Sequence, residues 1–301
     1  MEQKKISVIQ VPFGLGSSRN GTELGPESMK ATGLFRQIRQ LGYEVVAEPT
    51  VAPGASPQAG DAEKSGVKHL AAVRDMARRV AGHVSEAIGA GSFPLVVGGD
   101  RSVAIGALAG VTARSANAGA IFFNAFGDLN DESSLPSGFA NGMAIAVALG
   151  QAGFKLTDVD AGARFLNKDN IVLIGLRHLE PREKDVIRTL GIRYFTMYDI
   201  DKIGIERVVE QAVEIAGAGT DGIHVSFAAD CLDPLEAPGV SSPIPGGLSY
   251  REAHFACELL AETGRVRSMD VTEVNAALDE NRRTARLAVG LVASTLGKRI
   301  M

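Results

Sequence analysis

The sequence predicts an α/β protein whose central, mostly parallel sheet is covered by helices on both faces. Two observations support this prediction. Apolar segments of strand length alternate with amphipathic segments of helix length, and several of the apolar segments end in glycine and a polar residue. The chain has 301 residues, 45% of them hydrophobic, and contains no linker-like segment, so we expect one domain over residues 1–301. In this architecture ligands bind beyond the carboxyl ends of the strands.

The first elements are predicted from β-branched residues and from breakers. A strand over 6–11 ends at Pro12 and a glycine-rich stretch. One helix is expected over 26–41, because proline suits a first helical turn and Gly42 ends the apolar periodicity. A second strand follows within 42–49. The stretch 51–66 is rich in Pro, Gly, Ala and Ser and is predicted to be a surface connection.

Apolar residues then recur at spacings of three and four over 69–89, which predicts an amphipathic helix. The segment FPLVVGGD (93–100) is a fully apolar strand that ends in two glycines and an acid. Ser102 is expected to cap the apolar helix that follows, over 102–111.

The rest of the chain repeats this alternation. Five more strands are predicted within 119–128, 170–177, 193–200, 222–230 and 265–275. Helical segments are predicted near 141–150, 181–190, 206–217, 249–263 and 283–299.

Composition narrows the possible partners and location. The formal net charge is -4 and no run of Lys or Arg stands out, which argues against nucleic acid and against an anionic membrane. No apolar run reaches the length of a membrane span, and the first residues lack the apolar core of a signal peptide. With two cysteines in 301 residues, we expect a reduced, cytoplasmic protein.

Polar residues gather where the predicted strands end. Five segments contribute them: Asp100 and Arg101; Asn124, Phe126 and Asp128; Arg177, His178 and Glu180; Asp230 and Asp233; Asp270 and Glu273. Because the carboxyl ends of parallel strands meet at one edge of a sheet, these residues predict a binding site there.

Several of these segments resemble the signature blocks of the ureohydrolase family, the arginases and agmatinases. They are GGDRS (98–102), NAFGDLN (124–130), PSGFANGM (136–143), the stretch 226–252 and the stretch 270–288. The N-terminal stretch from FGLGSSRNG resembles the arginase branch in particular. The resemblance implies a three-layer α/β/α arginase-like fold, a dinuclear manganese site at the strand ends, and a homotrimer or homohexamer.

The resemblance also assigns six metal-ligand positions, at which the family carries His, Asp, His, Asp, Asp and Asp. In this chain they are Arg101, Asn124, Phe126, Asp128, Ala228 and Asp230. Mn²⁺ needs several oxygen or imidazole ligands, and only two carboxylates remain. We therefore expect a vestigial site with no metal, no cofactor in place of the family's two Mn²⁺, and no catalytic residue.

A buried pair of aspartates is unfavourable without a cation. We expect Arg101 to point into the former metal cavity and to pair with Asp128, Asp230 or both, and Phe126 to be a core residue. The resemblance further implies a site for a guanidino or amino-acid compound. Its possible ligand-binding residues are Asn130, Ser137, Asn141, Glu180 and Glu273.

Three functions follow from this reading. The first is a non-catalytic binding or regulatory subunit that keeps the fold and associates with itself or with an active relative. The second is an arginase-type or agmatinase-type hydrolase of a guanidino compound with an unusual single-metal or metal-free site. The third is a purely structural subunit. Cys231 has no base beside it in the sequence and is not expected to act as a nucleophile.

Overall fold

The computed structural model describes residues 4–52, 54 and 66–299. Its centre is an eight-stranded sheet in the order β2-β1-β3-β8-β7-β4-β5-β6, in which every neighbouring pair is parallel. The strands are β1 Lys5–Gln10, β2 Glu44–Ala47, β3 Phe93–Val97, β4 Ala118–Phe123, β5 Ile171–Leu176, β6 Arg193–Thr196, β7 Gly222–Ala228 and β8 Val266–Thr272.

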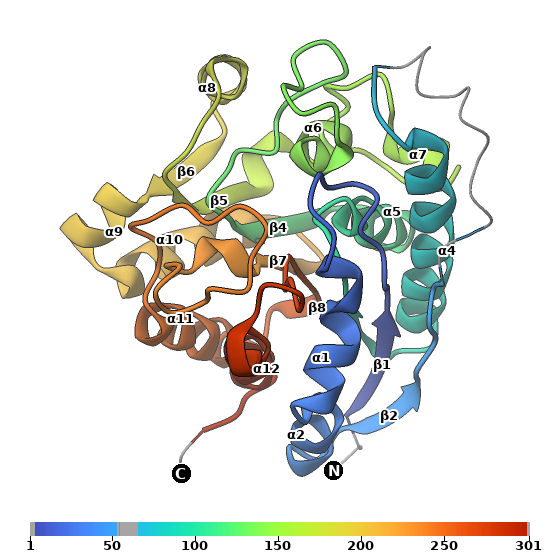
Figure 1. Cartoon of the computed structure of the whole chain (residues 1–301), viewed down its shortest axis with the longest axis vertical. Helices are drawn as coiled ribbons and strands as arrows, with labels where there is room; N and C mark the ends of the chain where they lie inside the picture. The colour runs from blue at the N-terminus through green and yellow to red at the C-terminus, as the bar shows by residue number, and fades with distance from the viewer. Residues whose placement is uncertain (1–3, 53, 55–65, 300–301) are drawn as a thin grey trace.

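Helices cover both faces of this sheet. Successive side chains of a strand point to opposite faces, so a strand that is apolar throughout presents an apolar surface on each face, and both surfaces must be buried. In β4, Ala120 and Phe122 pack in one apolar core, whereas Ile121 and Phe123 pack in the other. The first core contains residues of α4 Leu70–Gly89, α5 Val103–Arg114, α6 Ala144–Ala148, α7 Leu156–Val159 and α8 Pro181–Leu190. The second contains residues of α1 Gly25–Ala31, α2 Leu34–Gln40, α9 Met197–Ile203, α10 Ile205–Gly217, α11 Tyr250–Glu262 and α12 Arg283–Thr295. Figure 1 shows β1 between α1 and α4.

These layers confirm the predicted α/β fold with three layers. Four strands that are neighbours in the sheet, β3, β8, β7 and β4, lead directly into the predicted site segments. Arg101 follows β3, Asp128 follows β4, Asp230 follows β7 and Glu273 follows β8. The topology therefore brings these four side chains to one edge of the sheet.

Several local predictions were wrong. The helix expected over 26–41 is two helices, separated at Gly33, which has a φ of 100°. The strand expected over 193–200 ends at Thr196, whose side chain accepts a hydrogen bond from the Asp199 N–H and begins α9 instead. The short helix α7 was not predicted, and the connection over 51–66 lies mostly outside the described residues.

The predicted cap of α5 was also wrong. The Ser102 hydroxyl donates to Asp100 Oδ1 at 2.5 Å and makes no capping hydrogen bond to the helix. In addition, Asp270 was expected at the end of a strand but lies within β8, beside Ser226 of β7. Among the helices of the described residues, none is long and apolar enough to cross a membrane.

Candidate functional site

Arg101 lies at the centre of the strand-end site and is almost completely buried, with 7% of its side chain exposed. Its Nη1 forms an ion pair with Asp230 Oδ2, and its Nε lies 3.3 Å from Asp128 Oδ2. Arg101 was expected to pair with Asp128, Asp230 or both, and it pairs with both. Because β3, β4 and β7 lie close together in the sheet, three segments distant in sequence supply this one cluster.

Asn124 and Phe126 complete the surroundings of the guanidinium group. Asn124 Nδ2 donates to Asp128 Oδ2 at 2.6 Å, so the amide holds the second aspartate. The Phe126 ring lies 4.7 Å from the Arg101 guanidinium carbon and meets the His178 ring edge-on at 5.5 Å. Phe126 is only half-buried, so the expectation of a core residue was wrong: it covers a cation instead.

Glu273 approaches the cluster from the end of β8. Its Oε1 accepts a hydrogen bond from the Arg101 N–H at 2.9 Å. Glu273 and Asp128 both have positive φ values, 67° and 48°, which is rare for residues other than glycine. Backbone strain of this kind is found most often at functional sites.

The electrostatics of the site are dominated by burial. Loss of solvation raises the pKa of Asp128 to about 7, that of Glu273 to about 8 and that of Asp100 to about 6. Burial also disfavours a charged guanidinium, but the attraction of Asp128 and Asp230 exceeds this effect and raises the pKa of Arg101 above its ordinary value. The site thus combines one permanent cation with carboxyl groups that hold protons near neutral pH.

Besides the Arg101 Nε donor and the Thr272 hydroxyl, four buried carboxyl and amide oxygens at this edge have no hydrogen-bond partner among the described residues. They are Asp128 Oδ1, Asp230 Oδ1, Glu273 Oε2 and Asn130 Oδ1. Buried polar atoms are normally satisfied, so each of these atoms calls for an explanation such as backbone strain, a bound water or a bound ion. The hydrogen bonding of the cluster is therefore incomplete within the protein alone.

The other predicted ligand-binding residues lie farther out. Asn130 is buried, Asn141 and Glu180 are half-buried, and Ser137 is exposed. Ser137 Oγ accepts from the Phe139 N–H at 3.2 Å, and the Glu180 N–H donates to Glu183 Oε2 at 2.9 Å at the start of α8. No hydrogen bond between these side chains is present among the described residues, so their grouping into one ligand site stays a prediction.

Arg177 was expected among the polar residues at the strand ends, but its supporting role and the contacts of His224 were not predicted. The Arg177 guanidinium donates to the backbone carbonyls of Asp230, Leu232 and Ile244, which fixes the loop that follows β7. An arginine directly after an apolar strand was the available sequence signal, but its partners were not. His224 in β7 bonds to Ser268 and Asp270 in β8, each at 2.8 Å, and ties the two strands together beneath the site.

The two manganese ions implied by the family resemblance do not fit this arrangement of side chains. Arg101 lies between Asp128 and Asp230, so its positive charge already pairs with the two carboxylates that a divalent ion would need as ligands. Among the described residues, no group of three or more His, Cys, Asp or Glu is placed to hold a metal ion. Beside Ala228 and Ser226 remains a void of only about 10 Å³, which is too small for a substrate.

Comparison with known proteins places this geometry in context. The model of the arginase family matches residues 4–297. The arginase of Bacillus caldovelox is 39% identical over 298 residues, which cover 99% of this chain and all of the relative, and that of Brevibacillus brevis is 37% identical over 298 residues, 99% of each chain. A crystal structure of Bacillus cereus arginase superposes with a TM-score of 0.92 at 41% identity, and the native Bacillus caldovelox structure with a TM-score of 0.94 at 38% identity. Each alignment covers 99% of this chain and 100% of the solved one.

These relatives overturn the expectation that the chain takes no cofactor. They are named arginases and match this chain over nearly its whole length. Resemblance to the arginases implies a site for two Mn²⁺ ions. The absence of a cofactor therefore does not follow from the substitutions. The structural finding is narrower: with Arg101 in its present position, Asp128 and Asp230 alone cannot provide the several ligands that each ion needs.

Proposed function

This chain belongs to the arginase family, and from that premise we propose that it is a member in which an internal ion pair replaces the hydrolytic centre, so that it acts as a binding or regulatory subunit. The observation that carries this proposal is the position of the Arg101 guanidinium between Asp128 and Asp230. An arginine in that place brings a positive charge to one oxygen of each carboxylate.

The substitutions support the proposal at the level of chemistry. By resemblance, Arg101 stands at a histidine ligand, Asn124 and Ala228 at bridging carboxylates, and Phe126 at a second histidine. A dinuclear hydrolase needs two ions about 3.5–4 Å apart to form the bridging hydroxide that attacks its substrate. Alanine cannot ligate a metal, and the Asn124 amide is already engaged with Asp128.

The ligand that we propose is a guanidino or amino-acid compound. Glu273 Oε2 and Asn130 Oδ1 are buried acceptors without a partner, and both positions belong to the substrate-contacting set by resemblance. A guanidinium or ammonium group would donate to the Asn130 carbonyl oxygen and, on binding, would favour the ionised form of the Glu273 carboxyl group. Assembly as a homotrimer or homohexamer, alone or with an active relative, is part of the same proposal.

A second candidate is arginase-type hydrolysis, and the comparisons by themselves favour it, because the relatives named above are arginases. For this candidate to hold, Arg101 must leave the space between the two aspartates when metal arrives. The two candidates therefore differ in one measurable respect, namely whether manganese displaces the Arg101 ion pair.

Purified full-length protein dialysed against excess Mn²⁺ separates them. We expect no urea release from arginine or agmatine, and a raised melting temperature with arginine or ornithine. The variant that combines Arg101→His, Asn124→Asp, Phe126→His and Ala228→Asp is expected to bind manganese stoichiometrically. Arg101→Lys is the matched control, since it keeps the cation and restores no ligand. Stoichiometric manganese with turnover in the unmodified protein supports the hydrolase instead.

A further inference from the structure

A second cavity lies at the opposite edge of the sheet, where the strands begin. Its volume is about 690 Å³, within the range of small-molecule sites. Its walls come from the starts of β1, β3, β4, β7 and β8 and from the last turns of α4, α5, α11 and α12. No residue of the Arg101 cluster lines it, although His224 and Ser268, which join β7 to β8 beneath that cluster, do. We refer to it as the basal pocket.

The charge of the basal pocket opposes that of the whole chain, whose net charge is -4. Four cations line it, Lys4, Lys5, Arg114 and Arg267, against one acid, Asp221. None of the four cations forms an ion pair with an acid of the described residues. Arg114 Nε donates to Ser85 Oγ at 2.7 Å and Lys4 Nζ lies 5.5 Å from the centre of the Tyr43 ring, but neither neutral partner cancels the charge. Like charges placed together attract an anion.

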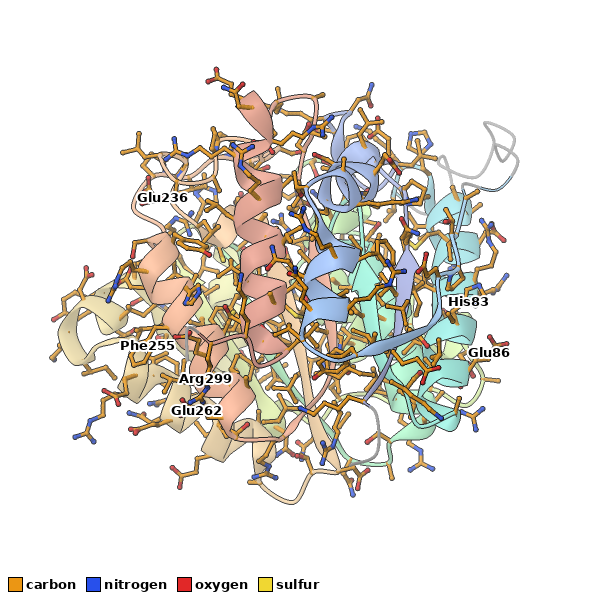
Figure 2. The ribbon with its side chains drawn as sticks, turned by 90° about the horizontal axis from the view of Figure 1, so that it is seen from below. His83, Glu86, Glu236, Phe255, Glu262 and Arg299 are labelled. Atoms are coloured by element: carbon orange, nitrogen blue, oxygen red, sulfur yellow. The ribbon has the colours of Figure 1, made fainter. Side chains whose placement is uncertain are left out.

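The single acid does not balance these cations. Asp221 Oδ2 accepts hydrogen bonds from Ser115 Oγ at 2.9 Å and from the Asn117 N–H at 3.0 Å. Glu262, at the end of α11 and next to the pocket residue Ala261, is also unable to balance them, because it pairs with Arg299 at 2.6 Å. Figure 2 shows these two labelled residues close together. The pocket therefore keeps an excess of positive charge.

A simpler explanation covers only part of this charge. Cations are favourable at the carboxyl ends of helices, and Arg114 is the last residue of α5. Lys5 and Arg267 belong to strands, however, and Lys4 directly precedes one. The helix dipole therefore does not explain three of the four cations.

The floor and walls of the pocket suit an organic ligand. The floor carries Ser92 and the pair of His224 and Ser268, which are buried and held by hydrogen bonds of 2.8 Å. Tyr43 and Phe93 supply aromatic wall area. A fixed polar floor, apolar walls and cations at the opening match a molecule with an anionic group on a carbon framework.

We propose that the basal pocket binds a small organic oxyanion, bearing either phosphate or several carboxylates. Arginine and lysine recognise both groups by charge-assisted hydrogen bonds. This site is independent of the strand-end site, so it stands whether or not that site is hydrolytic.

The test is calorimetric titration of the full-length protein, at constant ionic strength, with pyrophosphate and with citrate. We expect saturable binding of at least one of them. The double variant Lys5→Gln/Arg267→Gln is expected to weaken that binding by about tenfold or more, which equals about 1.4 kcal/mol. Binding of pyrophosphate alone assigns a phosphate ligand, and tighter binding of citrate assigns a carboxylate ligand.

Two further variants keep the proposal open to refutation. Ala261→Trp narrows the pocket without changing charge and is expected to abolish binding. Lys184→Gln/Arg188→Gln removes the same charge from exposed positions on α8 and is expected to change nothing. The proposal fails if neither anion binds saturably, if Ala261→Trp binds normally, or if the α8 variant weakens binding as much as the pocket variant.

Discussion

The two edges of the sheet differ in where their charged groups lie: those of the carboxyl edge are buried and paired, and those of the amino edge are exposed. At the carboxyl edge, Asp128, Asp230 and Glu273 surround Arg101 in a buried cluster. At the amino edge, exposed cations surround an open cavity of about 690 Å³. Buried charge must be compensated within the protein, whereas exposed charge is compensated by water and salt. The carboxyl edge is therefore linked to stability, and the amino edge is free to respond to a ligand.

The sharpest way to break this comparison is to remove the central cation. Arg101→Ala leaves the aspartates buried without their partner, and we expect a loss of about 3–5 kcal/mol in the free energy of unfolding. Denaturation by urea measures it. Adding Asp230→Asn to that background is expected to recover part of the loss, because one uncompensated charge disappears. A loss below about 1 kcal/mol would show that the cluster does not depend on Arg101.

Acidity tests the same edge with a smaller expected effect. The carboxyl groups of Asp128 and Glu273 have pKa values raised to about 7 and about 8, from ordinary values of 3.8 and 4.5. Between those limits the folded state binds more protons than the unfolded state, so the free energy of unfolding should fall as pH rises from about 4 to about 8. Urea denaturation at a series of pH values measures this slope.

Glu273→Gln removes one of these titrations and should flatten the decline in its upper part, toward pH 8. The matched control is Glu236→Gln, at a half-buried position outside the cluster that is labelled in Figure 2 and lies 3.9 Å from Arg283, and its profile should follow that of the unmodified protein. An equal slope in the Glu273 and Glu236 variants would contradict the assigned proton on Glu273.

The smallest effect is expected at the amino edge. The double variant Lys5→Gln/Arg267→Gln changes exposed side chains without ion-pair partners among the described acids, so its free energy of unfolding should stay within about 0.5 kcal/mol of the parent. Urea denaturation without added anion measures it. A loss comparable to that of Arg101→Ala would mean that these cations, too, are structural, and the contrast between the edges would disappear.

Much of the fold could be predicted because local patterns report burial. Eight strands lie where apolar runs were found, and the periodicity of three and four over 69–89 matches α4. Prediction was wrong where a side-chain contact decided the outcome. Thr196 and Asp199 together begin α9 inside an apparent strand, and Asp100 takes the Ser102 hydroxyl that was expected to cap α5.

The same division applies to the candidate site. The sequence by itself determined that a cation stands among carboxylates at the strand ends, because family motifs mark those positions. The pairing of Arg101 with Asp128, Asp230 or both was predicted as well, but only the tertiary structure decided that Arg101 meets both and that Phe126 covers the guanidinium. The basal pocket was not predicted at all, because its cations come from separate strands and helices. The pattern of apolar and polar residues in a segment predicts which of its side chains are buried. Contacts between side chains that are distant in sequence depend on the order of the strands in the sheet.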